Sequence, residues 1–419
     1  MSLDLLSATS RVETPFIIAE IAGISFGIYN TETRNIIQGN SQYKSLVATY
    51  PNFMNSLTVT KINGAVNTYN LVMVYAIAKG DDPNLLEKVF SKAKKDRTIY
   101  LSYGDLSLPS YIYKREEALI SNITSNIDFS GSKITYNISC TSKALQASSG
   151  TFNFPRKIAK PSDVIKELLY NNTYGLLEIF YGMRDKGKVL QNYLIISDDA
   201  SVVIEAKNNI SPLKYLEYLV TCMIPENQDT NTILKNSMYR ISIYDDLTND
   251  YNGPYFKVTK ISSNLKKDTL NTYIINIGYP DQNIVTNFSI NDNQVYSILY
   301  DYSNQIDQPK YIQRIDNNGN LVSEYSPSLS NSNNLLRTTA SDKTWWTNMT
   351  SFPINVTLTI KGLIKPAILM SYVYLDCRFY GNKHYSSGYY TITKQTDNVS
   401  ASGFKTTLNL LRVGGDDDY

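Results

Sequence analysis

Histidine and cysteine are scarce in this sequence, and each shortage excludes a class of function. The chain has 419 residues but one histidine, His384, and three widely spaced cysteines, Cys140, Cys222 and Cys377. A single histidine leaves no histidine-based metal site and no Ser-His-Asp site with a second histidine in support. The sparse, odd set of cysteines gives neither a disulfide framework nor metal-ligand spacing, and it fits a reduced compartment. We therefore expect no catalytic residue, no cofactor and no bound metal.

The sequence also lacks a large excess of either positive or negative charge, and it lacks long apolar runs. No apolar stretch is long enough to span a membrane, and the N-terminus lacks the basic start and apolar run of a signal peptide. The net charge is +2, so there is no global electrostatic case for nucleic-acid binding. Adjacent carboxylates such as Glu116 and Glu117 would point to opposite faces of a strand and would not form a general acid and base. These absences argue against an enzyme and against membrane insertion.

Hydrophobic residues make up 42% of the chain, which is enough for real cores, and the length suggests two or three domains. Tyrosine is abundant, with 34 copies. A tyrosine buries a ring and keeps a polar tip, which suits half-wet strands and interfaces. An AT-rich genome would produce the same enrichment, so both explanations stay open.

The first region, 1–150, has the pattern of a small β-barrel or sandwich. Short β runs at 16–21 and 25–29 read as a hairpin, and 57–62 alternates strictly between apolar and polar residues. A helix is predicted from about 83, with Asp82 as its N-cap. A β pair at 116–127 and 133–141 follows, which predicts strands covered by a single helix.

The middle region, 151–345, is predicted to mix helices and strands. Helices are expected at 164–170 and 212–223, and the stretch 302–344 is polar and reads as a long loop. Trp345 and Trp346 follow it. Two indoles beside a polar loop could bind a sugar or a protein partner, but we favour a hydrophobic plug where the loop re-enters the fold.

The last region, 346–419, has the clearest β pattern. Residues 353–362 alternate, and further strands are predicted at 370–380, 388–394 and 404–413. The polar residues 395–398 are predicted to be the loop joining the last two strands. We expect a four-stranded antiparallel unit built like the first barrel, followed by a flexible acidic tail.

Motifs in this last region resemble the C-terminal part of bacteriophage tail baseplate hub proteins. They read K-G-L-x-x-P, then S-G-x-Y, then G-F-x-T-x-L-x-L-x-R. The residues are Lys361, Gly362, Leu363, Pro366, Ser387, Gly388, Tyr390, Gly403, Phe404, Thr406, Leu408, Leu410 and Arg412. The start of the chain, 15–29, resembles the entry of the first hub barrel, and the helix beginning at 211 resembles one that packs on the second. The pieces cover about half the chain in matching order.

The resemblance implies an α+β, mainly β fold. It has two tail-tube-like antiparallel β-barrels with covering helices and a middle β-rich insertion. It implies a structural virion component of the tail baseplate, assembled in the host bacterial cytoplasm. Three chains would form a homotrimeric ring that adapts a six-fold tail tube to a three-fold spike. Exposed strand edges would be satisfied by neighbouring chains.

The partners implied are the tail tube protein above and the spike or needle protein below. Tape-measure, baseplate wedge and sheath-initiator proteins are further candidates. DNA would meet the chain only in transit through the channel, so a strongly basic channel wall would contradict this interpretation. Two alternatives remain: the hub of a phage-derived contractile device, such as a tailocin or a secretion machine, and a carbohydrate-binding β module.

Overall fold

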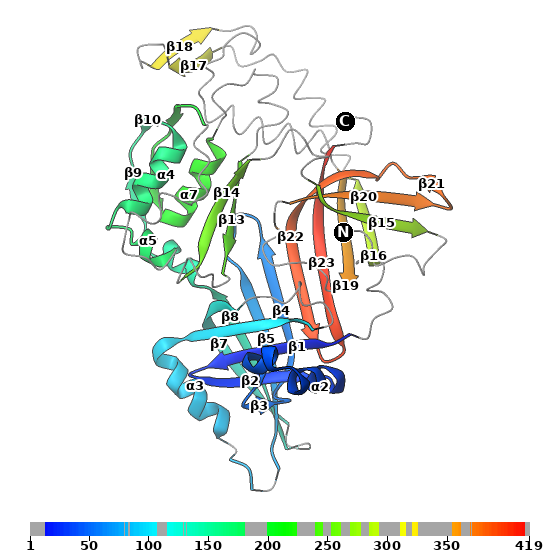
Figure 1. Ribbon diagram of the computed structural model, residues 1–419. Coiled ribbons are helices and arrows are strands. Elements are labelled where there is room, and N and C mark those ends of the chain that lie inside the picture. Colours follow the sequence, from blue (N-terminus) through cyan, green and yellow to red (C-terminus); the bar gives the residue numbers. More distant parts are fainter. Residues whose placement is uncertain are drawn as a thin grey trace.

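The computed structural model describes most of the chain. The described residues are 13–78, 80–82, 84–106, 115–128, 130, 132–180, 199–223, 239–245, 253–260, 269–277, 285–292, 311–315, 321–325, 354–361, 369 and 371–414. Figure 1 shows three parts: a first unit at the bottom of the view, a middle unit at upper left and a second unit at upper right. Among the described residues, no helix is long and apolar enough to cross a membrane.

The first unit is a curled, mainly antiparallel sheet with short helices on its outside, and its two-residue strand β3 runs parallel to β2. Its strands are β1 (Pro15–Ile21), β2 (Ile24–Tyr29), β3 (Tyr50–Pro51), β4 (Met54–Ile62), β5 (Thr68–Ala76), β6 (Thr98–Asp105), β7 (Glu116–Asp128) and β8 (Lys133–Ser142). They run in the order β4-β5-β8-β7-β6-β1-β2-β3. The predicted hairpins at 16–29 and 116–141 are therefore confirmed as β1–β2 and β7–β8.

Alternation along the strands builds the core of this unit. In β4 the side chains of Leu57 and Val59 are buried and those of Thr58 and Thr60 are partly exposed. Successive side chains of a strand point to opposite faces, so at β4 one face of the sheet is apolar and the other is polar. The outer elements are α2 (Thr31–Gly39), η2 (Ser41–Leu46) and α3 (Leu85–Asp96).

Helix α3 begins later than predicted. Its first residue is Leu85, and the Asp82 carboxylate accepts a hydrogen bond from the Asn84 backbone N–H at 3.0 Å. Asp82 also forms an ion pair with Lys88 at 2.6 Å. Asp82 thus supports the start of the helix from three residues before it.

The middle unit has its own apolar core between helices and short strands. Its elements are η4 (Lys143–Ser148), β9 (Phe152–Phe154), β10 (Lys157–Ala159), α4 (Pro161–Tyr170), α5 (Leu176–Ile179), β11 (Val202–Ile204), β12 (Lys207–Ile210), α7 (Pro212–Thr221), β13 (Tyr239–Tyr244) and β14 (Tyr255–Lys260). Helix α7 begins after the N-cap Ser211, as the sequence predicts.

Helix α7 packs inside the middle unit. Its buried residues, such as Leu216 and Leu219, contact the core formed with α4, η4 and β13. The resemblance to hub proteins implied that this helix packs on the second barrel. The apolar stripe predicted from the sequence is present, but α4 and β13 cover it, and a stripe alone does not identify the surface that it packs against.

The second unit is a six-stranded sheet in the order β16-β19-β23-β22-β20-β15. Its strands are β15 (Thr269–Ile277), β16 (Val285–Asp292), β19 (Ile354–Lys361), β20 (Tyr372–Phe379), β22 (Gly388–Ser400) and β23 (Gly403–Gly414). The two-residue strand β21 (Asn382–Lys383) pairs with β20, and β17 (Tyr311–Ile315) pairs with β18 (Leu321–Tyr325) as a separate ribbon. Strand β15 runs parallel to β20, which departs from the expected all-antiparallel pattern.

The first and second units share one continuous sheet. Strand β22 pairs with β4 antiparallel from Lys394↔Ile62 to Ser400↔Ser56. The polar stretch 395–398, predicted as a loop, is therefore strand, and the prediction was wrong at this point. Its inward-facing side chains, Gln395 and Asp397, are fully buried and hydrogen-bonded to each other at 2.9 Å.

The α+β, mainly β class is confirmed. The hydrogen-bonded order of the described strands is an open path from β16 to β3, curled around its cores, and does not close on itself.

Candidate functional site

Four charged side chains lie buried where the three units meet. Lys61 of β4 forms an ion pair with Glu116 of β7, and both side chains are almost fully buried. Asp397 of β22 and Asp245, just after β13, complete the group. Burial alone would lower the pKa of Lys61, but the carboxylates of Glu116, Asp397 and Asp245 outweigh it and raise the pKa. The ammonium group therefore stays charged. We call these four residues the buried junction.

Asp245 links the middle unit to the first unit. Its carboxylate accepts hydrogen bonds from Asn67 Nδ2 at 2.7 Å and from the Tyr69 hydroxyl at 3.0 Å, and it also accepts one from the Ser142 hydroxyl. Its backbone oxygen accepts a bond from the Glu117 N–H at 3.2 Å. Burial, helped by the nearby Glu116 charge, raises the pKa of Asp245 to about 7 despite these donors.

Asp397 links the second unit to the first. Its carboxylate accepts hydrogen bonds from Thr406 Oγ1 at 2.6 Å and from Gln395 Nε2 at 2.9 Å. The β22–β23 hairpin thereby carries a hydrogen-bonded polar pair into the first unit, beside the apolar Val399 and Phe404. The buried junction holds three acids and one base in a dry site, which suits a structural tie between units.

The sequence contains a signal for part of this junction. Lys61 stands on the inward side of an alternating strand, two residues after Val59 and four after Leu57. A lysine at such a position is almost never buried without a partner. The partner could not be named from the sequence, because Glu116, Asp245 and Asp397 are far away in the chain.

Part of the predicted hub motif forms a corner of the second unit. Arg412 donates hydrogen bonds to the backbone oxygens of Tyr385 at 2.9 Å and Ser387 at 3.2 Å. The Tyr390 hydroxyl donates to the Ser386 oxygen at 2.6 Å. Gly388 pairs with Leu375 of β20. Ser387, Gly388, Tyr390 and Arg412 are thus brought together to hold the chain between β20 and β22.

The rest of the described motif lies on β23. Gly403 follows the tip of the β22–β23 hairpin with a φ of +152°, and a Cβ placed there would meet Glu13 Oε2 at 2.2 Å. Phe404 is buried in the core of the first unit, with its ring edge-on to Tyr103. Thr406 contacts Asp397, and Leu408 and Leu410 belong to the core of the second unit.

Several predicted residues cannot be placed in detail. Gly362, Leu363, Pro366, Trp345 and Trp346 lie outside the described residues, and Lys361 is described only as the last residue of β19. His384 packs between the rings of Phe379 and Tyr385, with centroids 4.6 and 4.3 Å away, and its Nδ1 lies 2.8 Å from Ser386 Oγ. It is a packing residue of the β20–β22 connection.

Two strands of the shared sheet have an open edge within the described part of the chain. Beyond Leu119, β7 is paired with β8 alone, and residues 121–128 are exposed or partly exposed. Strand β16, at the other end of the sheet, is paired with β19 alone. The exposed segment of β7 is neutral up to Asp128, and Ile127 is 58% exposed. Proteins normally protect such an edge with charges, proline or a covering segment.

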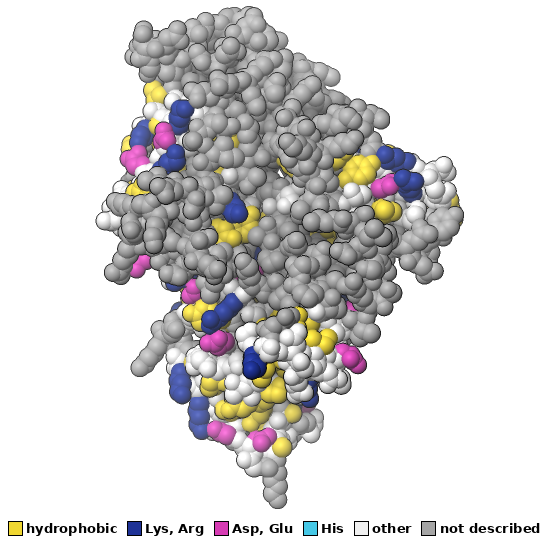
Figure 2. Space-filling model, viewed as in Figure 1, with side chains coloured by type: hydrophobic (Ala, Val, Ile, Leu, Met, Phe, Trp, Pro, Cys, Tyr) yellow, Lys and Arg dark blue, Asp and Glu magenta, His cyan; other side chains and the backbone are white. Residues whose placement is uncertain are grey.

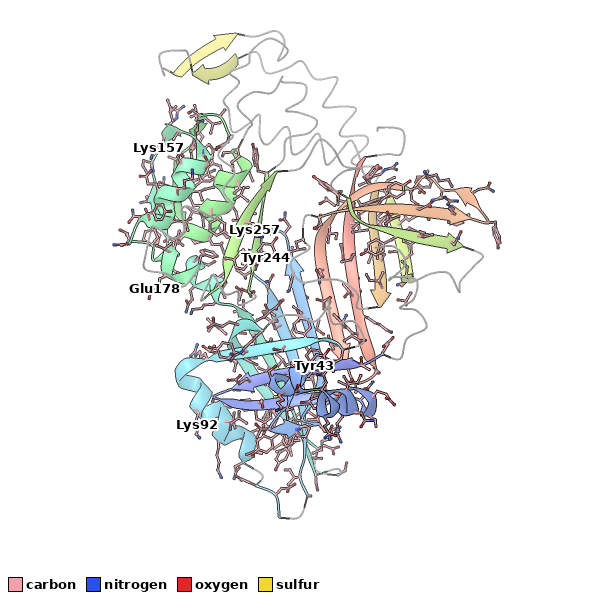
Figure 3. The ribbon with its side chains drawn as sticks, in the orientation of Figure 1. Tyr43, Lys92, Lys157, Glu178, Tyr244 and Lys257 are labelled. Carbon is pink, nitrogen blue, oxygen red and sulfur yellow. The ribbon has the colours of Figure 1, made fainter. Side chains whose placement is uncertain are left out.

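Charged side chains of both signs are seen on the described part of one face. Figure 2 shows basic and acidic side chains interspersed among the coloured residues of this face. On the β13–β14 ribbon, Lys257 Nζ lies 5.5 Å from the centroid of the Tyr244 ring, and both residues are labelled in Figure 3. An open cleft of about 610 Å³ lies between this ribbon, the end of α7 and the second unit, with Glu217, Ile241 and Lys394 in its wall.

Solved structures of tail proteins and of a secretion-system component align with this chain. The tail protein of Neisseria meningitidis MC58 aligns with a TM-score of 0.50 at 8% identity, over 95% of this chain and 96% of that one. The 43 kDa tail protein of prophage MuSo2 from Shewanella oneidensis aligns at 0.49 and 10% identity, over 96% and 97%. An E. coli component of the type VI secretion system, described as similar to T4 tail proteins, aligns at 0.44 and 6% identity, over 87% and 74%.

No protein-family model matches the sequence, and no curated protein matches it. The alignment with the Neisseria tail protein spans nearly the full length of both chains, so this chain has the fold of a tail protein. The resemblance to tail baseplate proteins that the sequence motifs indicated is thus confirmed at the level of the fold. At such low identity the likeness establishes the fold.

Proposed function

We propose that the chain is a structural, non-enzymatic component of a phage tail, the baseplate hub. Three copies form a ring between a six-fold tail tube and a three-fold spike and leave a channel for tape measure and DNA. The shared fold supports a tail component. The observation that supports a ring is the sheet shared by the first and second units. Within the chain, β22 pairs with β4, whereas the outer segment of β7 and the edge of β16 have no further strand beside them in the described part of the chain.

The two units contribute equivalent sets of strands to that sheet. The first set runs β4-β5-β8-β7 and the second runs β16-β19-β23-β22. Each set ends in a long hairpin, β7–β8 in one and β22–β23 in the other, whose outer strand is paired near its base with β6 or β20. In this correspondence β22 matches β7, and β4 matches β16.

The correspondence identifies the missing contacts. Inside the chain, the end of the second set (β22) pairs with the start of the first set (β4). The matching contact would pair the end of the first set, β7, with the start of the second set, β16, in another copy. Such head-to-tail contacts close into a ring when the rotation returns to the start. With two sets per chain, three copies give a ring that is three-fold by sequence and nearly six-fold in shape.

The remaining parts of the proposal follow from the place of such a ring. The tail tube protein would bind above and the spike below, and wedge, sheath-initiator and tape-measure proteins are further partners. The chain would assemble with itself in the bacterial cytoplasm and act in the tail of the virion. DNA would pass through the ring without stable binding.

The first test is the absolute mass of the purified protein by light scattering, with negative-stain images of the same peak. We expect a mass near three times the 47.4 kDa of one chain and a hollow ring. If the protein is monomeric alone, it is co-expressed with a candidate spike protein. A chain that stays monomeric in both preparations would contradict the proposal.

Edge variants test the contact itself. Ile127→Lys adds a charge to the open edge of β7 and should convert trimer to monomer, because a charged edge opposes strand pairing. Leu145→Lys is the matched control, since Leu145 is an apolar residue of η4 that is 43% exposed. It should leave the mass unchanged. Equal effects of the two variants would argue against pairing through β7.

A further inference from the structure

A row of threonines crosses the shared sheet from one unit to the other. Successive register partners on β19, β23, β22, β4, β5 and β8 are Thr359, Thr407, Thr396, Thr60, Thr68 and Thr141. All six are partly or fully exposed and lie on the face opposite the apolar cores. The row continues without a break across the β22–β4 junction.

The neighbouring rows on this face are also mainly polar. One contains Lys405, Asn398, Thr58, Asn70, Ser139 and Asn122, and the next contains Ser400, Ser56, Val72, Asn137 and Thr124. Among the described side chains of this face, the charged ones are few: Lys405 at the β23 end of its row, Lys394 in the row on the other side of the threonine row, and the partners Asp128 and Lys133 at the tip of β7–β8. We call the area covered by these rows the hydroxyl–amide face.

Its polar groups bond along the surface. Thr359 Oγ1 lies 3.0 Å from Thr407 Oγ1, and the Thr58 hydroxyl donates to Asn398 Oδ1 at 2.9 Å across the junction. β-branched side chains such as threonine are also stiff. The face is therefore a stiff, hydrophilic surface.

Such a surface has little affinity for nucleic acid. Binding to DNA depends mainly on lysine and arginine side chains that neutralise phosphates and release counterions. The threonine row supplies none. The other common device is a set of aromatic side chains on which bases stack. These rows contain no aromatic residue and hold threonine, serine, asparagine, one valine and, at the β23 end of one row, Lys405.

We propose that the hydroxyl–amide face is the wall of the channel, and that the passing polyanion slides along it without being retained. The inference rests on the proposed ring. The opposite face of the sheet is filled by the cores of the two units, so only this face is available to line a central opening. Pairing of β7 with β16 of the next copy would join the rows of three copies into continuous belts.

Cysteine labelling tests which way the face points. The three native cysteines are buried, so single added cysteines can be followed. Thr58→Cys and Asn70→Cys, both on the face, are compared with Lys92→Cys on the exposed side of α3 (Figure 3). In the assembled trimer we expect the face cysteines to react with a small maleimide but not with maleimide coupled to a protein carrier. Lys92→Cys should react with both.

The outcomes separate two kinds of failure. If the trimer forms and the carrier labels Thr58→Cys as readily as Lys92→Cys, the face is external and this inference is overturned, while the ring stands. If the mass shows that no trimer forms, the proposed function itself fails and this inference fails with it.

A charge-addition variant gives an independent reading. The triple variant Thr60→Lys, Thr396→Lys and Thr407→Lys places cations in the threonine row of each copy. In a pre-formed ring of this variant, linear double-stranded DNA should be retained in a salt-dependent way, whereas closed circles of the same length should not. The unmodified ring should retain neither. Equal retention of linear and circular DNA by the triple variant would show that the row lies on the outside.

Discussion

The β7–β8 and β22–β23 hairpins are the same element in two different situations. Each begins with a 13-residue strand and returns along a long antiparallel partner. The outer segment of β22 pairs with β4, and its inward residues Gln395 and Asp397 are completely buried. The outer segment of β7 has no such neighbour among the described residues, and its side chains are exposed.

The difference shows what docking adds to a hairpin. Once β22 lies against β4, polar side chains on its inner face become members of a buried network that reaches Lys61 and Glu116. The exposed segment of β7 corresponds to β22 before docking. Substitutions that weaken the docked hairpin, its buried junction or its corner, compared with controls elsewhere in the chain, would test this difference.

The largest effect is expected at the apolar anchor of the docked hairpin. Phe404→Ala removes a buried ring from the core of the first unit and should lower the free energy of unfolding by about 3–5 kcal/mol. Ile127→Ala in the undocked hairpin should cost no more than about 0.5 kcal/mol in the monomer, because surface positions contribute little. Denaturant unfolding of both variants measures the difference. Equal losses would contradict the distinction between the two hairpins.

The ion pair beneath the hairpin comes next. Lys61→Ala leaves Glu116 buried without its cation and should cost roughly 3–5 kcal/mol, since an uncompensated buried charge is expensive. Changing both partners, in Lys61→Met with Glu116→Gln, removes the charges together and should recover most of that loss. Denaturant unfolding compares the two. A double variant as unstable as the single one would show that the charges themselves stabilise the junction.

The raised pKa of Asp245 should make the stability of the protein depend on pH. Its pKa is raised to about 7 in the folded chain, whereas an unfolded aspartate titrates near 4. Between these values the native state binds more protons than the unfolded state, so the free energy of unfolding falls as pH rises.

A single extra bound proton changes the free energy of unfolding by at most about 1.4 kcal/mol per pH unit. When the free energy of unfolding is measured at pH 4 to 8, Asp245→Asn should show a pH dependence that is smaller by this contribution. Glu217, whose burial also raises its pKa to about 7, would leave a residual slope of the same sign. An unchanged slope in Asp245→Asn would rule out a protonated Asp245 in the native state.

The smallest effect is expected at the corner of the second unit. Arg412→Lys replaces a planar guanidinium that reaches two backbone oxygens, and should cost roughly 1–2 kcal/mol. Arg378→Lys is the control, because Arg378 pairs with Asp376 on an exposed surface where such pairs contribute little. The midpoint of thermal unfolding is measured for both variants. Similar decreases in the two midpoints would contradict a special contribution of Arg412 to stability.

Local patterns in the sequence were sufficient to predict many strands. Alternation placed β4 and β19, and the paired runs at 116–141 gave β7–β8. The failure at 395–398 has a physical cause: Gln-Thr-Asp-Asn is a typical loop composition, and it becomes strand because β4, more than 300 residues earlier, supplies the other edge. Long-range pairing of this kind leaves no mark in a local pattern.

The candidate site was predicted less well than the fold. Motif residues such as Ser387, Tyr390 and Arg412 do come together, but they stabilise a corner. The buried junction was missed because its members are brought together only by the tertiary fold. Lys61 alone could have been noticed, as a charge on the inner side of an alternating strand.

The junction between β22 and β4 also has a mechanical consequence. The ladder hydrogen bonds of an antiparallel pair run perpendicular to the strands. A force that pulls the two units apart along the strand direction therefore loads every pair from Lys394↔Ile62 to Ser400↔Ser56 at once, in shear. A force that peels the hairpin from its tip loads one pair at a time. The same contact therefore resists a force along the strands strongly and a peeling force weakly, so the direction of the force decides whether the two units stay joined.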